Sequence, residues 1–271
     1  MKGAVAAGHP QTSEAAKLIL EAGGNAFDAV LAALCAACVV EPVLTSLGGG
    51  GFLLARRDSG ETGLFDFFVQ TPKRKRPIDQ IDFHPIIADF GTAQQEFHIG
   101  TGSIATPGTV HGLFEVHRQL GTLPMRTLME PAIGYARNGI MTNALQAYIF
   151  SVVAPIYVAT EEARKVYGRG AEKKRLCAEG ELLRQPDLAD TLEILAHEGE
   201  KLFYEGEMAK SLVELSRLDG GHLTSQDMQG FRTETRKPLQ HTYRGTGIYT
   251  NPPPLIRRHA HPLCPAVAHD Y

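Results

Sequence analysis

Residues 23–54 read GGNAFDAVLAALCAACVVEPVLTSLGGGGFLL and carry the strongest structural signal in the chain. Asn25 is placed to cap a helix, because its amide oxygen can accept hydrogen bonds from the free N–H groups of a first turn. Residues 29–40 contain no charge, and a helix that is apolar all round is expected to be buried on all sides. The run is too short to cross a bilayer, which needs about 20 apolar residues. We therefore expect a central core helix.

Four consecutive glycines, residues 48–51, follow this helix and precede the apolar run 52–55. Glycine lets the backbone turn tightly and approach a neighbour closely. The run lacks the spacing of phosphate-binding glycine loops, so close backbone packing is favoured over a phosphate cradle. Cys35 and Cys38 lie one helical turn apart and could form a redox or metal pair, but their apolar surroundings favour ordinary core side chains.

The composition points away from charged macromolecular partners. The chain has 271 residues, of which 43% are hydrophobic and 21% charged, with a net charge of −3. That balance gives no electrostatic footprint for nucleic acid or for an anionic membrane. Two of the four cysteines fall inside the core helix, which fits a reducing compartment, and no signal-peptide pattern is visible. We expect a cytoplasmic protein.

The remaining pattern predicts mixed helices and strands. Helices are expected at 12–22 (capped by Thr12 or Ser13), 107–120, 126–137, 143–159 with a bend at Pro155, 187–197, 207–218 and 225–231. Strands are expected at 3–7, 52–55, 63–68, 103–106 and, as a pair around Gly245, within 239–250. Residues 78–95 alternate weakly and predict no helix.

Eight segments in order along the chain resemble the large-subunit half of the gamma-glutamyltransferase family. They are residues 3–33, SLGGGGFLL at 46–54, IATPGTVHG at 104–112, PAIGYARNGI at 131–140, LADTLEILAHEG at 188–199, FYEGEMAKSLV at 203–213, GGHLTSQDM at 220–228 and YTNPPP at 249–254. The resemblance implies an N-terminal-nucleophile hydrolase fold, a four-layer αββα sandwich. Residues 1–254 would form only the large-subunit portion of it.

The same resemblance implies the chemistry. A precursor cleaves itself, and the new N-terminal threonine of the small subunit attacks a gamma-glutamyl amide such as that of glutathione. Its own α-amine, with a pKa near 8, can act as the general base. The implied partners are a small amide or peptide substrate and the missing small subunit. No metal or organic cofactor is implied, and no catalytic residue is expected in this chain.

One departure from the family concerns substrate binding. Typical members carry an Asp-x-Arg-Glu-x-Ala-Pro segment, whose arginine pairs with the α-carboxylate of the glutamyl group. Here the matching residues 66–72 read DFFVQTP, with Phe68 at the arginine position and Gln70 two residues on. We assign Phe68 and Gln70 as candidate substrate-binding residues for a different acyl donor. The basic run KRKR at 73–76 could supply a substitute cation, although a solvated turn is favoured.

A second departure concerns residues 255–271, LIRRHAHPLCPAVAHDY, which do not match the family. Back-translated with permissible codons and read one base later, this tail gives SSGGTLIRFALRLLTT, which is similar to the family's continuation. We hypothesise that a single-base frameshift after Pro254 produced this tail. Sequencing of the encoding DNA tests the idea, which fails if no small-subunit frame lies downstream.

Two functional interpretations remain open at this point. In the first, the chain is the large-subunit fragment of a gamma-glutamyltransferase-like enzyme and is inactive alone, because it lacks the threonine nucleophile. In the second, it is a catalytically inactive binding protein, or a subunit that needs a separately encoded small subunit. An unrelated α/β domain is disfavoured by the ordered series of motifs.

Overall fold

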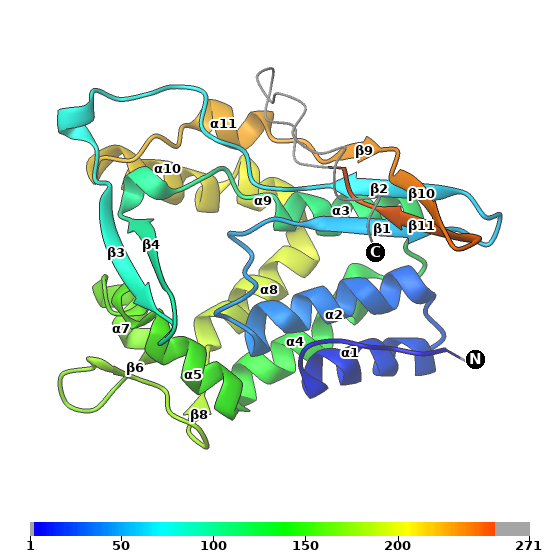
Figure 1. Ribbon diagram of the computed structural model, residues 1–271, viewed down its shortest axis with the longest axis horizontal. Helices are drawn as coiled ribbons and strands as arrows, with labels where there is room; N and C mark the ends of the chain where they lie inside the picture. Colours follow the sequence, from blue (N-terminus) through cyan, green and yellow to red (C-terminus); the bar gives the residue numbers. More distant parts are fainter. Residues whose placement is uncertain (1–2, 253–271) are drawn as a thin grey trace.

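The computed structural model describes residues 3–252, which form a helical body and a small antiparallel sheet (Figure 1). The helices are α1 (Pro10–Glu21), α2 (Ala26–Val40), α3 (Thr109–Leu120), α4 (Met125–Asn138), α5 (Ala144–Val152), α6 (Ala154–Tyr157), α7 (Glu161–Tyr167), α8 (Pro186–Glu198), α9 (Glu200–Tyr204), α10 (Glu207–Leu218) and α11 (Ser225–Gly230). The strands are β1 (Phe52–Arg56), β2 (Thr62–Asp66), β3 (His84–Asp89), β4 (Gln94–Ile99), β5 (Ile140–Met141), β6 (Gly168–Arg169), β7 (Arg175–Leu176), β8 (Leu182–Leu183), β9 (Glu234–Arg236), β10 (Leu239–Tyr243) and β11 (Thr246–Thr250).

Helix α2 is the centre of the helical body and packs against α1 and α4. Its first turn carries the cap that the sequence predicts: the Asn25 side chain accepts hydrogen bonds from the N–H groups of Phe27 and Asp28, both at 2.8 Å. The Asp28 carboxylate accepts in return from the Asn25 N–H at 3.0 Å. This reciprocal capping box satisfies N–H groups that no helical partner can reach.

One side of α2 departs from the expectation of complete burial. Leu31, Ala32 and Cys35 are fully buried, whereas the Val30 side of the helix reaches the surface, with Val30 itself 42% exposed. The expectation was wrong for this side because it faces a groove instead of packed neighbours. An uncharged helical stripe therefore lies open to solvent.

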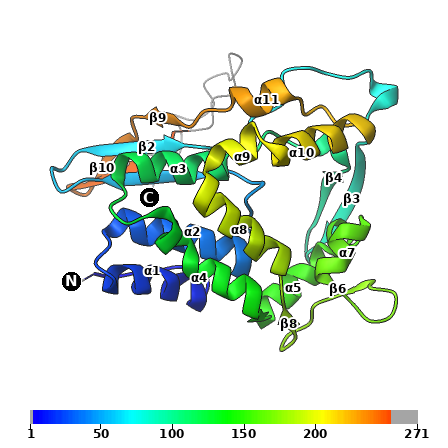
Figure 2. The same ribbon diagram turned by 180° about the vertical axis from the view of Figure 1, so that it is seen from behind.

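The sheet has the strand order β1-β2-β9, and both pairings are antiparallel. Strands β1 and β2 form the hairpin that the turn at residues 57–60 predicts, in the register Leu54 to Leu64. Strand β9 then pairs with β2 from far along the chain. Figure 2 shows α3 lying along the sheet on its rear side, next to α9.

In the described chain, three further hairpins stand outside this sheet: β3–β4, β6–β7 and β10–β11. Strands β10 and β11 pair as predicted around Gly245. The β3–β4 hairpin was not predicted, because the alternation in residues 78–95 is weak. Helices α5 and α6 divide next to Pro155, in agreement with the predicted bend.

Three smaller expectations were wrong. Residues 3–7 form no strand, since nothing in the described chain pairs with them. Helix α1 is capped by His9, whose Nδ1 accepts from the Gln11 N–H, instead of by Thr12 or Ser13. Residues 103–106 contribute only a single bridge between Gln70 and Thr106.

The predicted frameshift tail, residues 255–271, lies outside the described residues, so the hypothesis stays a prediction. Within residues 3–252, no helix has both the length and the apolar character that a membrane crossing requires.

Candidate functional site

A groove of about 690 Å³ runs between α2 and the segment that leads into β1. Val30, Ala33, Leu34 and Ala37 line one side, and residues 49–54 line the other. Figure 1 shows this connecting segment rising from the end of α2 to the start of β1. No charged side chain occurs among the described residues that line the groove. The groove is therefore suited to apolar or neutral groups.

The glycine run forms one wall of the groove and packs backbone against backbone. The Gly49 carbonyl accepts hydrogen bonds from the N–H groups of Gly108 at 2.8 Å and of Thr109 at 3.0 Å. A Cβ atom at Gly50 would stand 2.6 Å from the Phe67 carbonyl oxygen, which is closer than real Cβ atoms come. The prediction of close backbone packing is confirmed, and the glycines fix the groove wall against the first turn of α3.

Phe68 lies at the edge of this groove and forms an aromatic pair with Phe52, which lines it. The two rings are stacked, with centroids 5.5 Å apart and planes inclined by 13°. Phe68 is 45% exposed, so one side of the pair faces solvent. Its main-chain N–H donates to the Asp66 carboxylate at 3.1 Å, which fixes the backbone that carries the ring.

Asp66 is itself held by Arg236 of β9. The Arg236 Nη1 atom lies 2.6 Å from Asp66 Oδ2, and both side chains are only 16% exposed. A partly buried, hydrogen-bonded ion pair is stronger than a surface pair. The charge of the Arg236 guanidinium is therefore already neutralised by Asp66. Sequence reasoning missed this contact, because 170 positions separate the partners.

Gln70 is held by its backbone and not by its side chain. Its N–H donates to the Thr106 carbonyl at 3.2 Å, and the Thr106 N–H donates to the Gln70 carbonyl at 2.8 Å. Thr106 is buried whereas Gln70 is exposed. The Gln70 amide is thus available to a ligand, two residues beyond Phe68.

The basic run at residues 73–76 is tied to a different part of the molecule. The Lys73 N–H donates to the Asp227 carboxylate at 2.9 Å, and the Arg76 N–H donates to His222 Nδ1 at 3.2 Å. Arg76 also donates from Nη2 to the Arg217 carbonyl at 2.9 Å. These contacts fasten the run to α10 and α11, and its solvated-turn interpretation is favoured over a substitute for the family's arginine.

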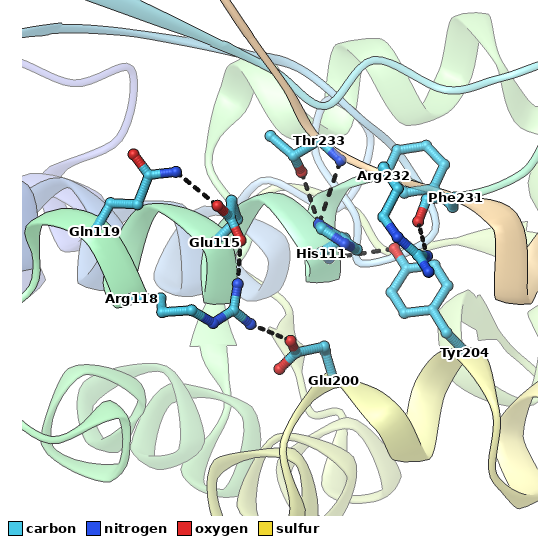
Figure 3. Close-up of polar contacts among 9 residues, drawn as sticks. All are labelled: His111, Glu115, Arg118, Gln119, Glu200, Tyr204, Phe231, Arg232 and Thr233. Atoms are coloured by element: carbon cyan, nitrogen blue, oxygen red, sulfur yellow. Dashed lines mark hydrogen bonds and ion pairs between the residues drawn. The ribbon is translucent and has the colours of Figure 1, made fainter.

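The N-terminus of α3 is supported from behind by a second group of side chains (Figure 3). The buried Tyr204 hydroxyl donates to the Pro107 carbonyl at 2.9 Å and accepts from the His111 N–H at 3.2 Å. His111 Nδ1 lies 2.8 Å from the Thr233 hydroxyl. The His111 within the segment TPGTVHG was visible in the sequence, but nothing there indicates its partners.

The cysteines and acidic residues of the described part of the chain give no further site. Cys35 and Cys38 are both buried, and burial raises the pKa of the Cys35 thiol to about 12. Their interpretation as core side chains is confirmed. Among residues 3–252, no group of three or more histidine, cysteine, aspartate or glutamate side chains could hold a metal ion.

Residues 12–256 match the family model described as gamma-glutamyltranspeptidase. The chain is 33% identical to a glutathione hydrolase proenzyme of Pseudomonas aeruginosa over 93% of its own length and 43% of the relative's. It is 31% identical to an acylase, "Acylase ACY 1 proenzyme", of Pseudomonas sp. strain V22, over 93% of this chain and 45% of that protein. The chain thus spans less than half the length of these relatives.

The solved gamma-glutamyltranspeptidase of Helicobacter pylori has a similar structure, with a TM-score of 0.82 and 29% identity, covering 94% of this chain and 72% of that one. The expected fold class is confirmed: the described residues have an N-terminal-nucleophile hydrolase fold of mixed helix and sheet, and they match only part of each of these solved chains. This chain belongs to the gamma-glutamyltranspeptidase family.

Proposed function

We propose that this chain supplies the large-subunit half of an acyltransferase or amide hydrolase, and that a second half supplies the threonine nucleophile. The groove beside α2 carries the proposal, because the described residues line it with uncharged groups, and the threonines among them, such as Thr109, are internal residues without the free α-amine of an N-terminal threonine. In the working enzyme, the threonine hydroxyl would attack the amide carbonyl with its α-amine as general base. The amine of the cleaved amide then leaves, and the acyl group remains on the threonine oxygen. Water or a second amine finally accepts this acyl group.

We further propose that the acyl donor differs from a gamma-glutamyl group. The α-carboxylate of such a donor needs a cationic fork, whereas here Phe68 stands at that position and Arg236 is committed to Asp66. The exposed face of the Phe52–Phe68 pair offers instead an apolar platform about one aromatic ring wide. An acyl group with an aromatic or branched apolar terminus would bury area on it, which stabilises binding by about 25 cal/mol per Å².

The first experiment tests the division into halves. Purified chain is assayed alone with gamma-glutamyl and phenylacetyl p-nitroanilides, and again after addition of a small-subunit half from a relative, beginning with threonine. We expect no release of nitroaniline by the chain alone and measurable release by the assembled pair. Release by the chain alone would refute the proposed division. If the assembled pair is inactive while the chain still binds a donor analogue, the binding-protein interpretation is favoured.

The second experiment tests the donor. Phe68→Arg restores the family's guanidinium at an exposed position. In the assembled pair, it should raise the rate with the gamma-glutamyl donor relative to the phenylacetyl donor by about tenfold or more. Phe83→Arg, at another half-exposed phenylalanine outside the groove, is the matched control and should leave the preference unchanged. An unaltered preference in Phe68→Arg would contradict the donor assignment while leaving the first experiment valid.

A further inference from the structure

A second pocket, of about 360 Å³, lies on the opposite side of the first turn of α3 from the groove. Thr109 lines the groove and His111, two residues later, lines this pocket. Residues two apart in a helix point to different faces. The other walls are α9 and the link between α11 and β9. The volume is within the range of small-molecule sites, which starts at about 300 Å³.

Part of the lining is already committed to internal contacts and forms a rigid frame. Arg118 forms ion pairs with both Glu115 and Glu200, linking α3 to α9. Tyr204 stacks on Phe231, with centroids 5.8 Å apart and an angle of 14° between the planes. Figure 3 shows the Arg118 ion pairs on one side of His111 and Arg232 on the other. These contacts hold the pocket wall in place, and the remaining polar groups of the lining take no part in them.

His111 presents a single N–H to a ligand. Its Nδ1 atom accepts from the Thr233 N–H at 3.4 Å, and a main-chain N–H can only donate. We assign the ring proton to Nε2, so that the Thr233 hydroxyl donates to Nδ1 at 2.8 Å as well. The described residues provide Nε2 with no hydrogen-bond partner. Burial lowers the pKa of His111, so the ring is neutral at pH 7 and keeps this proton arrangement.

Two cations and one carboxylate in the lining have no ion-pair partner within residues 3–252: Lys201, Arg232 and Glu205. Arg232 donates from Nη1 to the Gln229 and Phe231 carbonyls at 2.8 and 2.6 Å. Those bonds leave its Nε–Nη2 edge for a two-pronged contact with a carboxylate. The uncommitted groups thus include both donors for an anion and an acceptor for a cation.

We propose that this pocket binds a small zwitterion, an α-amino acid or short peptide, with its carboxylate on Arg232 and the His111 Nε2–H and its ammonium group facing Glu205. These uncommitted groups of opposite charge match a ligand that carries both a carboxylate and an ammonium group. The site is separate from the groove and does not depend on the proposed acyl transfer.

An NMR titration of the ¹⁵N-labelled full chain at pH 7.5 tests the assignment. L-Alanine, acetate and ethylammonium are added separately, and the Thr233 amide signal is followed because its N–H contacts His111. We expect saturable shifts with L-alanine, and at least about tenfold weaker binding of acetate and of ethylammonium, each of which offers only one charge.

Two variants assign the charges. Arg232→Gln should weaken L-alanine about tenfold or more, and Glu205→Gln should weaken L-alanine but leave the affinity for acetate unchanged. Arg56→Gln, at an exposed arginine of β1 outside the pocket, is the control and should bind as the parent chain does. Absence of L-alanine binding, equal binding of acetate, or unchanged binding by Arg232→Gln or by Glu205→Gln would each overturn the assignment.

Discussion

Helix α2 and the β10–β11 hairpin were both anticipated from local sequence, yet they are stabilised in opposite ways. Ten of the 15 residues of α2 are buried. The hairpin pairs along its whole length, but none of its residues is buried. A hydrogen-bonded ladder without apolar burial contributes little net stability. Local sequence pattern therefore predicts that an element forms, whereas the stability of that element depends on tertiary partners that the local pattern does not identify.

The largest expected difference in the free energy of unfolding is between substitutions at two neighbouring positions of α2. Leu31→Ala removes a side chain that is 1% exposed, and should lower the free energy of unfolding by about 3 kcal/mol. Val30→Ala, on the groove side, should cost under about 1 kcal/mol. Urea denaturation of both variants measures the difference. Equal losses would show that the groove side of α2 is packed in solution.

The next effect concerns the wall between the groove and α3. A Cβ atom at Gly108 would stand 1.9 Å from the Phe67 carbonyl oxygen. Gly108→Ala must therefore displace backbone, and we expect a loss of about 2–3 kcal/mol. Gly63→Ala in β2 meets nothing within 4 Å and is the matched control. Thermal unfolding compares the two, and a stable Gly108→Ala variant would contradict the close contact.

A third prediction concerns the buried end of α2. Asp28 accepts from the N–H groups of Thr122 at 2.9 Å and Leu123 at 3.4 Å, besides Asn25. Burial alone would raise the pKa of Asp28, but hydrogen bonds from Thr122, Asn25 and Leu123 outweigh it and hold the pKa below its usual value. Asp28→Asn should lower the free energy of unfolding by about 2 kcal/mol at pH 7.

The pH dependence of the effect of Asp28→Asn follows from the direction of the pKa shift of Asp28. Because the pKa of Asp28 is lowered in the folded state, its charge stabilises the fold fully above the pKa of an unfolded aspartate, about 3.9. This contribution is lost as pH falls from that value through the lower pKa of the folded state. The difference between the parent chain and Asp28→Asn, measured by urea denaturation, should therefore shrink between pH 6 and pH 3. A constant difference would assign the effect to shape instead of charge.

The smallest effect is expected in the hairpin. Ile248 is 43% exposed, so Ile248→Thr should change the free energy of unfolding by no more than about 0.5 kcal/mol. Leu64→Thr, in a strand position that is fully buried, provides the contrast and should cost several times more. A large loss at Ile248 in urea denaturation would mean that the hairpin is covered in solution.

Much of the fold was predictable where the signal is local. The Asn25 cap, the bend at Pro155 and the hairpin turn at residues 57–60 each depend on residues within one or two turns of chain. The strand expected at residues 3–7 was wrong, because an apolar run needs a partner strand and the described chain gives it none.

The candidate site was predictable only in part. Phe68 and Gln70 were selected from a motif, and their assignment to substrate binding stays a prediction. The Phe52 stack, the Asp66–Arg236 ion pair and the contacts of His111 were not found, because they join distant segments. Charge and aromaticity were visible in the sequence, but the pairing of particular side chains is set by tertiary packing.

The pairing of β9 with β2 also has a consequence for biosynthesis. Strands β1 and β2 can close as a hairpin soon after residue 66 has been made, whereas β9 supplies the next strand only at residues 234–236. Chains emerge from the ribosome N-terminus first, and an unpaired strand edge is a template for association with other chains. The Asp66–Arg236 ion pair therefore forms late, and the nascent chain carries an open β2 edge until Arg236 has emerged.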